Sequence, residues 1–370
     1  VGSTLFFTAS TAGLGRELYM LDLSNPGAGS VLVKDIQVGT GLGSDPAELT
    51  AVGPLLYFTA NDGGINRELW KSDGTSAGTV LVKDILPAPA VGVPNPSSQP
   101  TNLTAIGNLL LFTANDGNFG SELWKSDGST VGTTPLRDIN PGTGSSTPGS
   151  FFKAGSYIFF NANDGTNGRE LWASDGTGVG TVKVGADINI GPGDSTPTDF
   201  TQVGNLVFFS ANSGTGGREL WKVDLSQTTL SAGLVKDISP ASFTGSNPSN
   251  LTEVGGILYF TADPGTRAVE LWRSDGTAAG TFRVTALSQA TSGLAAFGGE
   301  LWFAGGAMNS TELWRSNGTA GGTLRLADAG LLDRDLDVWL VNAEANGTLT
   351  SGDATVAATP VASVDLMTVA

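Results

Sequence analysis

The chain has 370 residues, with 35 Asp and Glu against 19 Lys and Arg, and a formal net charge of −16. Because so acidic a surface repels phosphates and anionic lipids, and because no apolar run has the length of a membrane span, neither nucleic acid binding nor membrane insertion is expected. There is no cysteine and no histidine, which excludes disulfides and thiolate chemistry and removes the commonest general base.

One short motif recurs seven times along the chain. A glutamate followed by leucine marks each copy, and in six copies a tryptophan follows the leucine. A period of roughly 50 residues indicates one supersecondary unit that has been repeated. The marker glutamates are Glu17, Glu68, Glu122, Glu170, Glu219, Glu270 and Glu312.

The first copy begins partway through this unit. Residues 1–9 (VGSTLFFTA) match the end of the first strand and the whole second strand of the later copies. The first copy therefore lacks a first strand of its own.

The second copy shows the unit in full. Four short runs rich in β-branched and aromatic residues are bounded by Gly, Asn, Asp or Pro, at residues 46–53, 55–60, 67–73 and 79–85. The first three connections carry hairpin residues, and the fourth is longer and rich in Gly, Pro and Ser. This pattern predicts consecutive antiparallel four-stranded sheets.

The third strand of the unit indicates how the sheets pack. Leu69 and Trp70 are adjacent, so their side chains point to opposite faces of the sheet, and both faces must be covered. Sheets that cover one another around an axis form a β-propeller, and seven copies predict seven blades. We expect burial between blades, rather than a binding platform, for Trp70, Trp124, Trp172, Trp221, Trp272 and Trp314.

The C-terminal part departs from the repeat. Residues 1–328 are expected to form the seven propeller repeats, and residues 329–360 an insertion that fits no repeat. Residues 365–370 (DLMTVA) resemble the first strand of the unit. Residues 361–370 are therefore expected to complete the first blade, so that the C-terminal strand closes the propeller.

The consensus of the repeat resembles a known family. Glu68-Leu69-Trp70 followed by Asp73-Gly74-Thr75, with counterparts at Glu122, Glu170, Glu270 and Glu312, is similar to the ELWxxDGT repeat family of secreted bacterial proteins. The resemblance covers residues 1–328, with departures at 19–22, at 223–226 and at Asn317. It implies an extracellular or cell-surface bacterial protein, and it supplies no catalytic residues.

Two repeated polar features favour a structural role over a functional one. An arginine precedes the marker glutamate in four copies, as in Arg67-Glu68, and a ring of such pairs could bind a ligand. Catalytic sites are asymmetric whereas architecture repeats, so hydrogen bonds between blades are the favoured interpretation. In the Ser-Asp-Gly-Thr turns, Asp and Thr are expected to bond their own backbone.

The connections between the second and third strands gather acidic residues. Asp62, Asp116, Asp164 and Asp263 are the candidate ligands, and oxygen ligands without His or Cys suit Ca²⁺. The spacing matches no EF-hand or nonapeptide calcium repeat. Turns in which Asp or Asn bonds its own backbone are the alternative explanation of the same residues.

Three functions stay open at this stage. The first is a non-enzymatic, secreted or surface-exposed propeller that binds a glycan or protein on its loop face, as an adhesion module with no catalytic residues and no cofactor except possible Ca²⁺. The second is a glycan-cleaving hydrolase with paired carboxylates in the central funnel, since the lack of histidine excludes a Ser-His-Asp triad. The third is a self-assembling subunit of a surface filament or layer.

Overall fold

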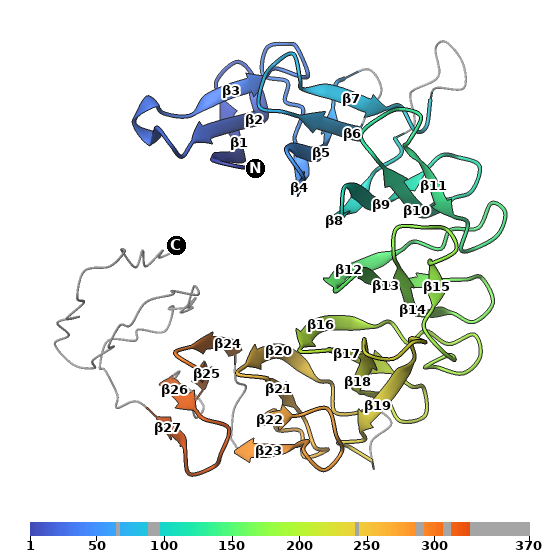
Figure 1. The fold of residues 1–370 in the computed structure, drawn as a ribbon, viewed down its shortest axis with the longest axis vertical. Coiled ribbons are helices and arrows are strands. Elements are labelled where there is room, and N and C mark those ends of the chain that lie inside the picture. Colours follow the sequence, from blue (N-terminus) through green and yellow to red (C-terminus); the bar gives the residue numbers. More distant parts are fainter. Residues whose placement is uncertain (64–66, 88–96, 241–243, 286–291, 306–311, 326–370) are drawn as a thin grey trace. The chain divides into compact units, whose positions relative to one another are not determined.

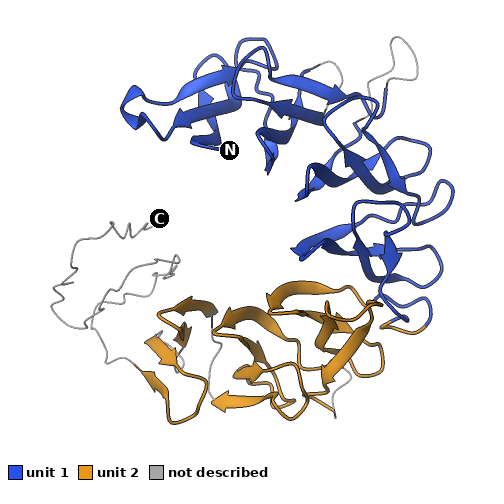
Figure 2. Ribbon diagram, viewed as in Figure 1, with its two compact units in different colours: residues 1–187, 191–194 blue, residues 188–190, 195–370 orange. Residues whose placement is uncertain are grey.

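A computed structural model describes residues 1–63, 67–87, 97–240, 244–285, 292–305 and 312–325. Within these ranges 27 strands form seven antiparallel sheets, and one short 3-10 helix, η1 (Pro26–Ala28), is present (Figure 1). No described helix has the length and apolar character that crossing a membrane requires. The chain divides into two compact units, residues 1–187 with 191–194 and residues 188–190 with 195–370, which are described separately (Figure 2).

The first unit contains four sheets in which each strand pairs with the next one along the chain. The first sheet has three strands, β1 (Thr4–Thr11), β2 (Gly15–Asp22) and β3 (Val31–Lys34). The second has β4 (Ala47–Val52), β5 (Leu55–Asn61), β6 (Arg67–Ser72) and β7 (Val80–Lys83), and the third β8 (Thr101–Ile106), β9 (Leu109–Asn115), β10 (Ser121–Ser126) and β11 (Thr134–Arg137). The fourth has β12 (Gly149–Ala154), β13 (Tyr157–Asn163), β14 (Arg169–Ser174) and β15 (Val182–Lys183).

The second unit contains three sheets of four strands with the same consecutive order. They are β16 (Thr198–Val203), β17 (Leu206–Asn212), β18 (Arg218–Asp224) and β19 (Ala232–Lys236); then β20 (Ser249–Val254), β21 (Ile257–Ala262), β22 (Glu270–Ser274) and β23 (Phe282–Thr285). The last is β24 (Ser292–Phe297), β25 (Glu300–Gly305), β26 (Glu312–Ser316) and β27 (Thr323–Arg325).

Within each unit the sheets stack as propeller blades do. The first strand of one sheet lies beside the first strand of the next: β4 beside β8, β8 beside β12, β16 beside β20, and β20 beside β24. The predicted fold class, an all-β chain of seven antiparallel β-propeller blades, is confirmed. In the described residues the first blade has three strands and the other six have four.

Both faces of the sheets are covered, as the Leu-Trp pairs predict. Trp70 packs against Leu18 and Val33 of the first sheet, whereas Leu69 packs toward Phe112 and Trp124 of the third sheet. The same exchange of leucine and tryptophan joins the third sheet to the fourth and the fifth to the sixth. The apolar core is therefore a series of layers between sheets.

The predicted burial of the tryptophans is confirmed for four of the six. Trp124 is 3% exposed, and Trp70, Trp172 and Trp272 are each less than 9% exposed. Trp221 and Trp314 are partly buried. The closing strand at residues 361–370 and the insertion at residues 329–360 lie outside the described residues, so both stay predictions.

Candidate functional site

The repeated glutamates join one sheet to the next. Glu17 is fully buried, and its carboxylate accepts hydrogen bonds from the Ile36 N–H at 3.3 Å, the Ser44 N–H at 2.7 Å and the Ser44 hydroxyl at 2.5 Å. The Ser44 carbonyl in turn accepts the Asn61 N–H of the second sheet at 2.9 Å. The same chain of bonds runs through Glu68, Ser98 and Asn115, through Glu122, Ser146 and Asn163, and through Glu219, Ser246 and Asp263.

The arginines of the repeated Arg-Glu pairs also bind backbone. The Arg67 guanidinium donates to the Thr59 hydroxyl at 2.9 Å and to the Asp45 carbonyl at 2.7 Å. Arg218 donates in the same way to the Thr196 carbonyl at 2.9 Å. The predicted hydrogen bonds between blades are therefore made by the glutamates, whereas Arg67 and Arg218 bond within their own sheet and to the segment just before its first strand.

The polar side chains of the Ser-Asp-Gly-Thr turns form hydrogen bonds within the turn itself. The Asp73 carboxylate accepts the Thr75 N–H at 2.8 Å and the Thr75 hydroxyl at 2.7 Å, which lowers the pKa of Asp73. The Gly78 N–H donates to the Thr75 hydroxyl at 2.9 Å. The prediction that these residues bond their own turn is confirmed.

The four calcium candidates lie in loops between the second and third strands of their sheets. Asp116 and Asp164 each accept two backbone N–H groups of their own loop through Oδ1, and Asp263 accepts three. Asp62 lies close enough to Asp84 to contribute to the raised pKa of that residue. No group of three or more acidic side chains that could hold a metal occurs in the ranges the structure describes. Calcium at these positions stays a prediction, which the melting temperature in excess chelator tests.

An aspartate directly follows the fourth strand of several copies, and three of these aspartates have a buried oxygen without a partner in the described part of the chain. One carboxylate oxygen of Asp35, Asp84 and Asp138 is buried without a hydrogen-bond partner among the described residues. Burial raises the pKa of Asp84, and the nearby Asp62 adds to the effect. These three carboxylates therefore keep an oxygen that can accept a further hydrogen bond.

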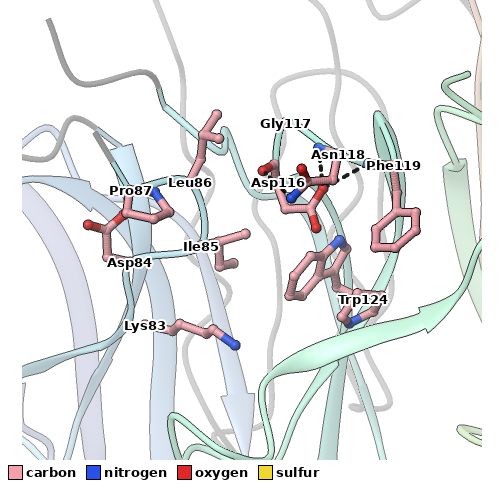
Figure 3. Close-up of a pocket in the computed structure, with 11 residues that line it drawn as sticks. Lys83, Asp84, Ile85, Leu86, Pro87, Asp116, Gly117, Asn118, Phe119 and Trp124 are labelled. Carbon is pink, nitrogen blue, oxygen red and sulfur yellow. Dashed lines mark hydrogen bonds between the residues drawn. The ribbon is translucent and has the colours of Figure 1, made fainter. Parts of the chain in front are cut away.

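An open pocket of about 690 Å³ lies at the junction of the second and third sheets, beside one of these aspartates. One wall comes from the end of β7 and the residues after it, and the other from the β9–β10 loop and β10. Figure 3 shows Lys83, Ile85 and Leu86 on one side, facing Asp116, Asn118 and Trp124 on the other. The lining residues are Lys83, Asp84, Ile85, Leu86, Pro87, Asp116, Gly117, Asn118, Phe119, Trp124 and Pro135.

The pocket forms where the repeat departs from its own pattern. The residue that follows the Asp-Ile pair of the fourth strand is polar at Gln37, Asn140, Asn189 and Ser239, but it is leucine at Leu86. The loop position filled by Asn167 in the fourth sheet is filled in the third by Phe119, which is 41% exposed. The equivalents of Phe119 in the first two copies, Leu14 and Ile65, are also apolar, so Leu86 is the residue that departs from the repeat at this junction.

Close packing holds the two walls together. A Cβ atom added to Gly117 would lie 2.8 Å from Leu86 Cδ1, and the φ of Gly117 is +80°, in the left-handed region. The Lys83 ammonium donates to the Thr133 carbonyl at 2.7 Å and lies 5.8 Å from the centroid of the Trp124 ring. Both contacts cross from the second sheet to the third.

Sequence reasoning singled out Asp116 as a possible ligand but did not find the apolar residues Leu86 and Phe119 of this pocket. A comparison of each copy with the others could have found Leu86, because its counterparts Gln37, Asn140, Asn189 and Ser239 are polar. The pocket joins Asp116 to Trp124, which was predicted as core, and to Asp84. Asp62, Asp164 and Asp263 do not line it.

No protein-family model and no curated protein sequence matches the chain. Solved structures that resemble it include the propeller domain of the Trilobed protease from Pyrococcus furiosus, at 11% identity and a TM-score of 0.42, covering 88% of this chain and 95% of that one. A prolyl endopeptidase structure matches at 16% identity and a TM-score of 0.46, covering 87% of this chain and 46% of that one. A puromycin hydrolase matches at 16% identity and a TM-score of 0.40, covering 88% and 52%. The chain spans about half the length of these last two, and at such identities and scores the likenesses carry no argument about function.

Proposed function

We propose that this chain is a non-enzymatic propeller, secreted or exposed on a bacterial surface, that binds a glycan or protein on the face formed by the loops between second and third strands. The observation that carries the proposal is the pocket between β7 and β10, where Leu86 takes the place of a residue that is polar at Gln37, Asn140, Asn189 and Ser239. A departure from an internal repeat is unnecessary for architecture, since the other junctions form without it.

The charged groups of the repeat support binding rather than catalysis. Glu17, Glu68, Glu122 and Glu219 are buried and accept hydrogen bonds from the connection to the next sheet. A general acid or base must reach the substrate proton that it transfers. Carboxylates enclosed in the joints between sheets do not have that access, and no arrangement of the described carboxylates favours the glycan-cleaving alternative.

The resemblance of the repeats to the ELWxxDGT family supports the location. The net charge of −16 also suits a protein that must stay soluble at a surface. Fractionation of the producing bacterium with an antibody to the chain checks this part of the proposal.

The test of the function is binding by the whole chain to a glycan array and to an array of surface proteins, with analysis of the bound glycans for cleavage. We expect retention of at least one ligand without turnover, and weaker retention by Phe119→Asn, which introduces the residue found at the equivalent place in the fourth sheet. Val179→Thr is the control, because Val179 is 91% exposed in a turn remote from the pocket in sequence. Cleaved glycans would favour the hydrolase, and self-association without ligand binding would favour the filament or layer subunit.

A further inference from the structure

We infer that the pocket between β7 and β10 receives an apolar side chain of a protein segment in which a lysine or arginine is the next residue. This inference rests on the proposed function and names the ligand class of the same site. Three features support it: the apolar lining of the pocket, the hydrogen bonds that its polar groups already make, and the negative charge of the chain.

The lining favours an apolar occupant. Ile85, Leu86 and Pro87 form one wall, and Phe119 and Trp124 belong to the other (Figure 3). These apolar side chains offer no hydrogen bonds to sugar hydroxyls, whereas an aliphatic side chain placed between them loses its contact with water. Burial of one leucine-sized side chain contributes about 1.5–3 kcal/mol.

The polar groups of the pocket are mostly engaged already. The Lys83 ammonium is bound to the Thr133 carbonyl, and Asp116 Oδ1 accepts the N–H groups of Asn118 and Phe119 at 2.9 and 3.0 Å. A sugar ring requires several hydrogen-bond partners for its hydroxyls, since buried polar groups without partners cost free energy. A peptide side chain has no such requirement, so a protein ligand is favoured over a glycan.

The remaining charge favours a cation beside the apolar anchor. Asp116 Oδ2 has no hydrogen-bond partner among the described residues, and Asp84 contributes a second carboxylate to the lining. The one cation of the lining, Lys83, is already held by a carbonyl. With a chain charge of −16, a positively charged segment is attracted and an acidic one is repelled.

The experiment uses three acetylated, amidated pentapeptides that differ in two residues: Gly-Gly-Leu-Lys-Gly, Gly-Gly-Leu-Glu-Gly and Gly-Gly-Gly-Lys-Gly. Cellotriose is the glycan probe. Amide chemical shifts of the assigned ¹⁵N-labelled chain report binding and its place. We expect the Leu-Lys peptide to shift the amides of Asn118 and Phe119 and to bind about tenfold or more tightly than the Gly-Lys peptide, because the leucine contributes its burial.

Variants of the chain assign each part of the recognition. Leu86→Gln and Phe119→Asn introduce the residues that the repeat has at Gln37 and Asn167, and each should weaken the Leu-Lys peptide. Asp116→Asn keeps an Oδ1 acceptor for the loop and should reduce the preference for Leu-Lys over Leu-Glu. Asp164→Asn makes the same charge change in the equivalent loop of the fourth sheet and should leave binding unchanged, as should Val179→Thr. Since Phe119 is exposed, Phe119→Asn tests the pocket even if Leu86→Gln does not fold.

The outcomes separate this inference from the proposed function. Shifts of the same amides by cellotriose but not by the Leu-Lys peptide would overturn the peptide inference and leave the binding module standing. Equal binding of Leu-Lys and Leu-Glu would overturn the cationic part. No shift by any probe would overturn the inference, whereas the proposed function would still be decided by the array measurement on the whole chain.

Discussion

Single residues hold this protein together at the interfaces between sheets. Trp172 is 6% exposed and packs with Leu123 and Ile139 of the preceding sheet, and the Arg137 guanidinium lies 5.7 Å from the centroid of its ring. Trp172→Ala should therefore lower the free energy of unfolding by about 3–5 kcal/mol, as truncations of large buried aromatics do. Urea denaturation measures the change. Trp314→Ala, at a partly buried counterpart, should cost less, and an equal or smaller loss for Trp172 would contradict this packing.

A buried glutamate should make stability depend on pH. Burial raises the pKa of Glu68 from 4.5 to about 7, against the opposing effect of its hydrogen bonds from Ser98 and Ile85. In this interval the native state holds a proton that the unfolded state has lost. The contribution of Glu68 to stability is therefore fully present below pH 4.5 and falls by up to about 1.4 kcal/mol per unit as pH rises to 7. Burial also raises the pKa values of Glu17, Glu122 and Glu219, so the whole chain should melt higher at mildly acidic pH.

Glu68→Gln isolates this contribution, because the amide resembles the protonated carboxyl. Its unfolding free energy should vary less between about pH 5 and pH 8 than that of the parent chain. Asp45→Asn, at an exposed carboxyl, makes the same change in net charge and should keep the slope of the parent. A parental slope in Glu68→Gln would show that Glu68 stays ionised in the native state.

At the scale of elements, the turn between the third and fourth strands has no room for a side chain at its second glycine. A Cβ atom on Gly78 would lie 2.0 Å from Asp73 Oδ1, and the Gly180 position is equally close to Asp175. Gly78→Ala should therefore displace the Asp73 carboxylate from Thr75 and lower stability by about 1–3 kcal/mol. Thermal melting measures this. Gly321→Ala is the control, because nothing lies within 4 Å of the added Cβ there, and equal losses at both positions would refute the steric explanation.

Much of each element was predictable, because hydrophobic alternation and turn residues are local signals. In the second copy, the strands predicted at residues 55–60 and 67–73 correspond to β5 (Leu55–Asn61) and β6 (Arg67–Ser72). The first strands were less predictable. Glu48 and Asn102 each have a φ of +58° at a bulge, a conformation that neither residue type dictates, and Glu48 accepts the Leu103 N–H of the next sheet at 3.2 Å. Such a backbone is imposed by the neighbouring sheet.

The candidate site was only partly predictable, for a related reason. Asp116 was found from its acidity, but the pocket depends on Leu86, which lies 30 positions earlier in the chain and belongs to another sheet. Apolar residues such as Leu86 and Phe119 carry no chemical signature of function on their own. Only the contrast of Leu86 with its polar counterparts, together with the stacking of sheets, places the two residues in one site.

At the scale of the whole molecule, the closing strand gives a further prediction. β1 is an edge strand of a three-stranded sheet in the described residues, while each of the other sheets has an additional first strand on that side. Deletion of residues 361–370 should lower the melting temperature of the chain in one cooperative transition, because an uncovered strand exposes backbone donors and acceptors. Differential scanning calorimetry checks this, with deletion of the last two residues alone as the milder control. A deleted chain that melts at the parental temperature would exclude these residues as the missing strand.

The bond from each buried glutamate to a serine, and from that serine to the next sheet, has a consequence for how such a chain can evolve. The second, third and fifth copies carry both halves of the joint: the glutamate that bonds to the outgoing connection, and the Asn whose N–H donates to the incoming serine. A copy that is duplicated, lost or exchanged therefore brings compatible ends with it, and no neighbour has to change. Substitutions in one copy that spare the glutamate, the serine and the Asn or Asp can therefore create a new binding surface, while the other sheets continue to pack as before.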